Sequence, residues 1–230
     1  MGKTKYQLGI DLGGTKIEGV VLDTTGEELF RERVGTEQEK GYQHILNQIQ
    51  LVYRNMVRHI EGESHTFGIG TPGAISQKTG LLKNSNTVCM NGKPVKEDLE
   101  NLLSRPIGMQ NDANCFAMAE ALLGAGKGND SVFGVIMGTG CGGGIVYKGE
   151  VITGLQSIAG EWGHVSIDPN GPLCYCGNKG CIETFISGGG LERMYKSTYN
   201  EELKLKKVVG NYRQGDSRAT EFMQQFFVNF

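Results

Sequence analysis

The strongest constraint on the fold is a pattern of strand, glycine-rich turn and strand that occurs twice. It appears first as "GIDLGGTKIEGVVLD" (residues 9–23) and again about 125 residues later within "IMGTGCGGGIVYK" (residues 136–148). Both copies place glycines directly after an apolar run, where a backbone can approach a ligand closely. The repetition predicts a duplicated α/β fold. Its lobes would be residues 1–114 and residues 115–230, with the active site in the central cleft.

Apolar periodicity and capping signals indicate the other elements. Segment 41–60 has apolar residues at helical spacing, and "NDANCFAMAEALLGAG" begins with two good capping residues and stops at Gly124. We expect Cys115 to lie on the core face of this second helix. The tail, residues 191–230, predicts two helices around "GNYRQGDSR". Strands are expected at residues 6–10, 17–22, 27–33, 65–70, 131–137 and 145–152.

The two glycine-rich turns are candidate phosphate-binding sites, because exposed backbone amides in such turns can hold an anion. Either turn alone is more often a simple hairpin with a polar start. Two of them in a duplicated fold favour a nucleotide, with magnesium oriented by the acidic residue of the first turn. The residues expected to bind the nucleotide and its metal are Asp11, Gly13, Gly14, Thr15, Lys16, Gly138, Thr139 and Gly140.

Two other nucleotide-binding motifs fit the sequence less well. "GAGKGN" resembles a phosphate-binding loop, but Gly128 follows Lys127 where that loop needs Ser or Thr. "GTGCGG" matches a dinucleotide fingerprint, with Glu161 near the distance of a ribose-binding acid. That fingerprint must open a helix, whereas residues 144–147 continue as a strand, so a dinucleotide site is the rival enzyme hypothesis.

The composition of the chain indicates its cellular compartment and the classes of partner that it can bind. The chain of 230 residues has a net charge of -2, no signal-peptide-like start and no apolar run long enough to span a membrane. We therefore expect a cytoplasmic protein without membrane or nucleic-acid partners. Thiols stay reduced in the cytosol, which favours catalytic, buried or metal-binding roles for the six cysteines over disulfides.

Three of these cysteines lie within eight residues, in "CYCGNKGC". Cys174, Cys176 and Cys181, with His164 ten residues upstream, form a Cys₃His set suited to tetrahedral zinc. A redox role is the weaker alternative, because the first pair is C-x-C rather than C-x-x-C. The spacing therefore predicts a zinc site.

The order of the motifs resembles the ROK family of sugar kinases and sugar-responsive repressors, which have the actin-like ATPase (ribonuclease H-like) fold. The resemblance rests on the two turns and on "GIGTPGAIS", "NSNT", "NDANCFAMAEA", "AGEWGH" and "CYCGNKGCIETFISG". It implies an ATP- and magnesium-dependent kinase acting on a hexose. Within the family the wording is closest to bacterial manno(fructo)kinases, which implies phosphorylation at O6 of fructose or mannose. An N-acetylglucosamine kinase or a glucokinase is the alternative.

The resemblance also assigns residue roles. On bare sequence Asp112 is a helix cap beside Asn111, but the family implies that it is the catalytic base. Glu161 and Glu183 would otherwise be surface acids, whereas Trp162 is expected to be a core aromatic. We further expect one ring nitrogen of His164 to bind zinc and the other to face the sugar. The implied sugar-binding residues are Gly73, Asn86, Asn111, Asp112, Glu161, His164 and Glu183.

Alternatives of other classes stay open. A ROK repressor would use the same sugar and zinc residues but needs a DNA-binding module, and the chain starts within five residues of its first strand. A silent sugar-binding protein is a third possibility. The family continues beyond the position of Phe230 with elements that hold the adenosine, so we expect a chain with its C-terminal part missing. Family members of this type form homodimers, which we expect of the full-length protein.

Overall fold

The computed structural model describes residues 4–230, and these divide into two compact units. The first unit contains the residues up to Cys115 together with Gly154–Ile158. The second contains Phe116–Thr153 and Ala159–Phe230. No helix among the described residues is long and apolar enough to cross a membrane.

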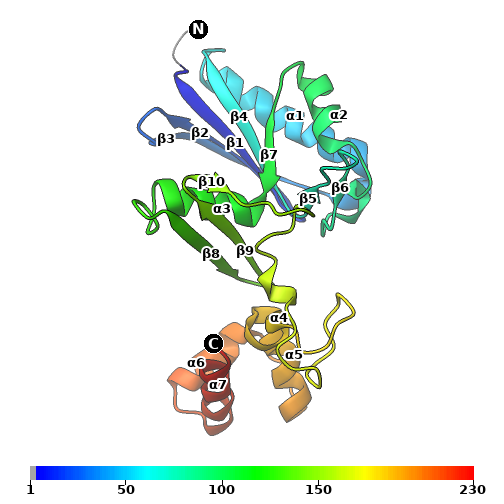
Figure 1. Ribbon diagram of the computed structural model, residues 1–230, viewed down its shortest axis with the longest axis vertical. Helices are drawn as coiled ribbons and strands as arrows, with labels where there is room; N and C mark the ends of the chain where they lie inside the picture. The colour runs from blue at the N-terminus through cyan, green and yellow to red at the C-terminus, as the bar shows by residue number, and fades with distance from the viewer. Residues whose placement is uncertain (1–3) are drawn as a thin grey trace. The chain divides into compact units, whose positions relative to one another are not determined.

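The first unit is built on a mixed five-stranded sheet. The strand order is β3-β2-β1-β4-β7, with β1 antiparallel to β2 and parallel to β4 (Figure 1). The parallel pairing continues from β4 to β7, so the carboxyl ends of three strands meet at one edge. The strands are β1 (Tyr6–Leu12), β2 (Lys16–Asp23), β3 (Glu28–Gly35), β4 (His65–Thr71) and β7 (Gly108–Asn111).

Helices α1 (Tyr42–His59) and α2 (Val95–Leu103) share an apolar core with this sheet. The contact is tight: a Cβ added at Gly19 on β2 would lie 2.4 Å from Cγ1 of Val52 on α1. Buried Ile45, Ile49 and Val52 recur at helical spacing, as the sequence predicts. A short hairpin of β5 (Ala74–Ile75) and β6 (Leu82–Lys83) follows β4.

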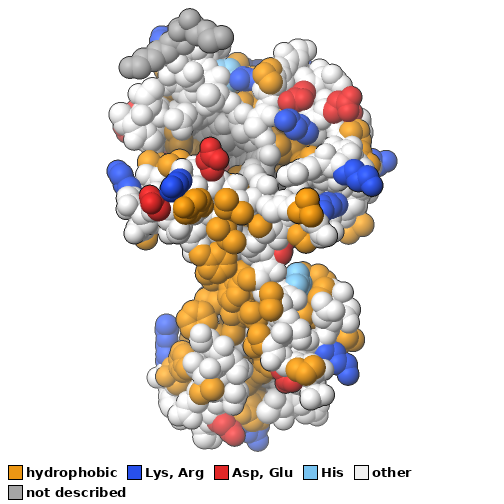
Figure 2. All heavy atoms as spheres, viewed as in Figure 1, with side chains coloured by type: hydrophobic (Ala, Val, Ile, Leu, Met, Phe, Trp, Pro, Cys, Tyr) orange, Lys and Arg blue, Asp and Glu red, His pale blue; other side chains and the backbone are white. Residues whose placement is uncertain are grey.

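The second unit contains a three-stranded sheet in the order β10-β9-β8. Its strands are β8 (Ser131–Met137), β9 (Cys141–Tyr147) and β10 (Glu150–Val151). Gly142, Gly143 and Gly144 lie inside β9, so the second turn is shorter than the sequence predicts. Alternation along β8 turns Gly134 toward Ala117 and leaves Phe133, Val135 and Met137 exposed. Figure 2 shows hydrophobic side chains gathered over β8 and β9.

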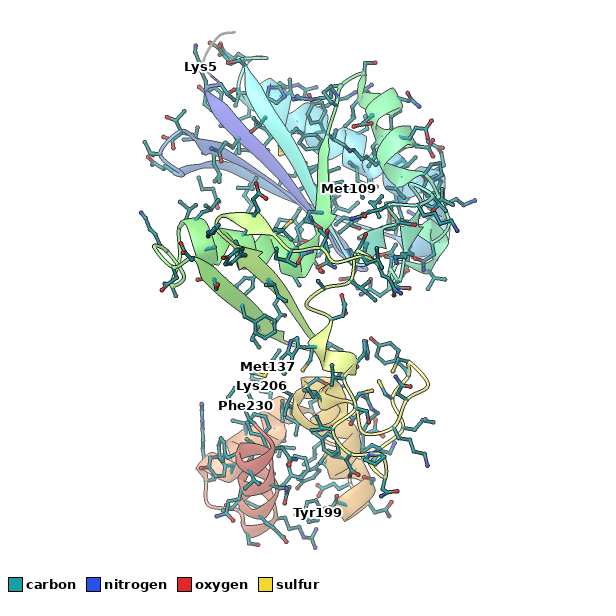
Figure 3. The ribbon with its side chains drawn as sticks, viewed as in Figure 1. Lys5, Met109, Met137, Tyr199, Lys206 and Phe230 are labelled. Carbon is teal, nitrogen blue, oxygen red and sulfur yellow. The ribbon has the colours of Figure 1, made fainter. Side chains whose placement is uncertain are left out.

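The predicted pair of helices in the tail is wrong, because three helices form there. They are α5 (Gly188–Tyr199), α6 (Leu205–Arg213) and α7 (Ser217–Asn229), and α4 (Ile182–Ile186) precedes them. Tyr199, labelled in Figure 3, lies at the end of α5, where its ring and that of Tyr195 contact Phe222 of α7. These rings help form a separate small core.

The predicted position of Cys115 is also wrong. Helix α3 (Asp112–Leu122) buries Ala113, Asn114 and Ala117, whereas Cys115 is exposed. Successive helical residues are rotated by about 100°, so a residue two positions after Ala113 lies on nearly the opposite side of the helix.

Candidate functional site

The carboxyl edge of the first sheet brings two acidic side chains together. Asp11, near the end of β1, is in register with Gly70 on β4, which pairs with Gln110 on β7. Asp112 follows two residues after Gln110, at the start of α3. Desolvation raises the pKa of Asp112 above its ordinary value, and the Asp11 carboxylate adds to the rise. Asp112 therefore binds a proton more readily than a solvated aspartate does.

Asn111 holds this helix start in place with both ends of its side chain. Its Oδ1 accepts a hydrogen bond from the Asn114 amide at 3.2 Å, and its Nδ2 donates to the Gly73 carbonyl at 2.9 Å. Gly73 has a φ of 82°, and a Cβ there would lie 2.3 Å from the Lys83 carbonyl oxygen. Only glycine fits this position. The hydrogen bonds to Gly73 and from Asn114 hold the side-chain amide of Asn111 next to the start of α3.

The first glycine-rich turn is closed by its own backbone. The Gly13 amide donates to the Lys16 carbonyl at 2.9 Å, and the Thr36 hydroxyl donates to the Gly13 carbonyl at 2.7 Å. A Cβ at Gly14 would be 3.4 Å from Oδ1 of Asn86, so the predicted sugar-binding Asn86 lies next to the turn. The side chains of Thr15 and Lys16 are exposed and able to reach a ligand.

The second turn is held by a buried carboxylate. Glu183 of α4 is 3% exposed, and its Oε2 accepts a hydrogen bond from the Cys141 amide at 2.9 Å. A Cβ at Gly140 would lie 2.5 Å from the same oxygen. The turn carbonyls of Gly138 and Thr139 accept hydrogen bonds from the amides that begin α5. Glu183 is therefore an interior brace for this turn, unlike the surface acid that bare sequence suggests.

The predicted zinc ligands lie together. The ligand atoms of His164, Cys174, Cys176 and Cys181 all fall within 4.8 Å of one another. Nδ1 of His164 is 3.6 Å from Sγ of Cys174, and the sulfurs of Cys176 and Cys181 are 3.6 Å apart. Tetrahedral zinc with bonds of about 2.3 Å to sulfur separates its ligands by about 3.6–3.8 Å. The donor set and its spacing suit this metal.

Tyr175 is a neighbour of this cluster that our sequence analysis missed. Its hydroxyl is 3.0 Å from Nε2 of His164, and the two rings meet edge to face with centroids 5.1 Å apart. Desolvation raises the pKa of Tyr175, and the carboxylates of Glu183 and Glu161 add to the rise. The nitrogen of His164 expected to face a sugar thus contacts a tyrosine. Only its place between two predicted ligands could have drawn attention to Tyr175.

The predicted site residues fall into two sets, one in each unit. The first unit contains Asp112, the first turn and the predicted sugar-binding residues Gly73, Asn86 and Asn111. The second unit contains Glu161, His164 and Glu183, the second turn and the cysteine cluster. Trp162 is partly buried and donates through its ring nitrogen to the Gly142 carbonyl at 2.7 Å. The individual roles of these residues in sugar and nucleotide binding stay predictions.

Comparison with known proteins gives a consistent result. A sequence model of the ROK family matches residues 7–230. An N-acetyl-D-glucosamine kinase of Haemophilus influenzae (strain 86-028NP) is 38% identical over 230 residues, covering 95% of this chain and 75% of that protein. The ROK hexokinase from Thermus thermophilus has a TM-score of 0.85 at 32% identity, covering 96% of this chain and 73% of its own.

A second solved structure agrees. A ROK family glucokinase from Streptomyces griseus, in complex with glucose and AMPPNP, has a TM-score of 0.74 at 30% identity. The match covers 96% of this chain and 75% of that one. Together with the family match, these likenesses confirm the predicted α/β fold of the actin-like ATPase class.

Proposed function

Because the chain belongs to the ROK family, we propose that it is an ATP-dependent sugar kinase whose substrate is N-acetyl-D-glucosamine. The observation that carries the substrate is the 38% identity to an enzyme of that name along nearly the whole chain. The preference for fructose or mannose that motif wording predicts has less support and stays the competing hypothesis.

The catalytic role falls to Asp112. Phosphoryl transfer to a sugar hydroxyl needs a carboxylate that accepts the hydroxyl proton, while most of the remaining catalysis is positioning and charge neutralisation. The raised pKa of Asp112 moves this carboxyl toward the operating pH, which favours proton acceptance in the transition state. Its hydrogen bond from the Ala113 amide, 2.8 Å long, keeps the side chain at the helix start.

The glycine-rich turns would hold the phosphates of ATP. Exposed Thr15 and Lys16 offer donors in the first turn, and Gly138 and Thr139 of the second turn are exposed to close approach. Asp11 would hold magnesium or its waters, and magnesium would neutralise charge on the phosphates. Glu183 would keep the second turn in shape, so its sugar-binding role and its bracing role would meet in one residue.

The cysteine cluster would hold one zinc ion through His164, Cys174, Cys176 and Cys181. Zinc bound to Nδ1 of His164 would fix the ring orientation and leave the proton on Nε2. The metal would thereby orient one residue of the proposed sugar site.

A sugar panel tests this proposal. The complete gene product is assayed for ATP consumption with N-acetyl-D-glucosamine, glucose, mannose and fructose. We expect kcat/KM for N-acetyl-D-glucosamine to exceed the others by about tenfold or more, a discrimination that a site built to bind the acetamido group can supply. A higher kcat/KM with fructose or mannose would show that this sugar is the substrate instead. Turnover of none of the sugars would refute the proposed kinase activity.

A further inference from the structure

The hydroxyl of Tyr175 contacts the ring nitrogen of His164 that the proposed function assigns to the sugar. The hydroxyl lies 3.0 Å from Nε2 of His164, whereas Sγ of Cys174 lies 3.6 Å from the other ring nitrogen, Nδ1. The same phenol lies within electrostatic range of Glu161 and Glu183. His164, Glu161 and Glu183 are the predicted sugar-binding residues of the second unit. The Tyr175 hydroxyl therefore contacts one of the groups predicted to bind a sugar hydroxyl.

From this arrangement we propose that Tyr175 is an internal competitor of the sugar, and that its hydroxyl must leave Nε2 of His164 before a sugar hydroxyl can bind there. The inference rests on the proposed function for the identity of the ligand. It adds a residue that sets sugar affinity without touching the reacting atoms.

The hydrogen-bond chemistry supports this competition. With zinc bound at Nδ1 of His164, Nε2 would carry the ring proton and have one hydrogen bond to donate. The Tyr175 hydroxyl lies at hydrogen-bond distance from that nitrogen, so a sugar oxygen can accept the bond only after the tyrosine has moved. The two acceptors exclude each other.

The surroundings of Tyr175 make the displacement inexpensive. The residue is 79% exposed, and its ring contact with His164 is an edge-to-face one. It lies in the C-x-C segment between Cys174 and Cys176, so zinc would anchor the backbone on both sides while the exposed side chain could rotate toward solvent. Rotation of an exposed side chain takes nanoseconds or less, much faster than turnover.

The test is Tyr175→Phe, which removes the competing hydroxyl and keeps the ring. A hydrogen bond of ordinary net strength corresponds to a factor of about 2–10 in affinity. We expect the Kd for N-acetyl-D-glucosamine, measured by calorimetry on the complete gene product, to fall by that factor. The KM should fall in parallel, kcat should change less than about twofold, and zinc content should stay the same.

Tyr147→Phe is the matched control, because Tyr147 is also an exposed tyrosine of the second unit but lies on β9. It should leave sugar affinity unchanged. An unchanged or raised Kd in Tyr175→Phe would overturn the competitor role, and loss of zinc would show that Tyr175 supports the metal cluster instead. Wild-type protein that binds none of the panel sugars would refute the proposed function, and the inference with it.

Discussion

A single carboxylate oxygen lies close to residue 140. Oε2 of Glu183 accepts the Cys141 amide and approaches the second turn so closely that a Cβ at Gly140 would lie 2.5 Å away. Gly138, two residues earlier in the same turn, has open space where its Cβ would be. Within one predicted phosphate-binding turn, Gly140 is therefore constrained by a protein neighbour, whereas a constraint on Gly138 would come from the ligand.

This difference predicts different stabilities for two alanine variants. Gly140→Ala should lower the free energy of unfolding by about 1–3 kcal/mol, the usual cost of forcing an extra carbon into a packed site. Gly138→Ala should change it by less than about 0.5 kcal/mol, as expected where no contact is strained. Urea unfolding of both variants measures the difference. Equal stabilities would show that Glu183 moves aside and does not brace the turn.

At the scale of elements, the segment from η3 (Trp162–His164) to α4 has little regular structure of its own. Two isolated bridges, Ser166 to Cys181 and Leu173 to Lys179, are the only strand pairings of this segment among the described residues. A loop of this kind is a natural place for metal cross-linking, since metal binding replaces a missing core.

Removing a zinc ligand should therefore disorder this loop and weaken sugar binding. Cys176→Ser is expected to reduce zinc from about one ion per chain to nearly none, and to raise the sugar KM well before the ATP KM changes. Cys89→Ser, in η2 (Val88–Met90) of the other unit, should keep its zinc. Metal analysis and both KM values provide the measurement. A zinc-free variant with an unchanged sugar KM would show that the metal has a structural role only and does not affect sugar binding.

The elements also show where sequence patterns succeed and fail. The sequence predicts α1 and the strands of the first hairpin well, because their apolar residues recur at helical or strand spacing over long runs. It misses the start of α5, where Gly188, Gly189 and Gly190 have poor helix propensity. The Ser187 hydroxyl accepts the Gly190 amide at 2.9 Å and supplies the cap that those glycines need.

At the scale of the whole molecule, motif order was enough to predict the family and the fold class, since each motif combines a backbone requirement with a chemical one. The contacts between distant residues could not be predicted in the same way. Glu183 reaches an amide 42 positions away, and Tyr175 meets His164 across an irregular loop. Such pairings depend on how the loops close, which no local periodicity records.

The central claim is that the chain phosphorylates a sugar with Asp112 as the base, and Asp112→Asn tests it most directly. Asparagine keeps the size of the side chain and an oxygen for the Ala113 amide, but it cannot accept the hydroxyl proton. Turnover of N-acetyl-D-glucosamine by the complete gene product should fall by about 10²-fold or more, with sugar Kd changed less than about threefold. Turnover within a few fold of wild type would contradict the account.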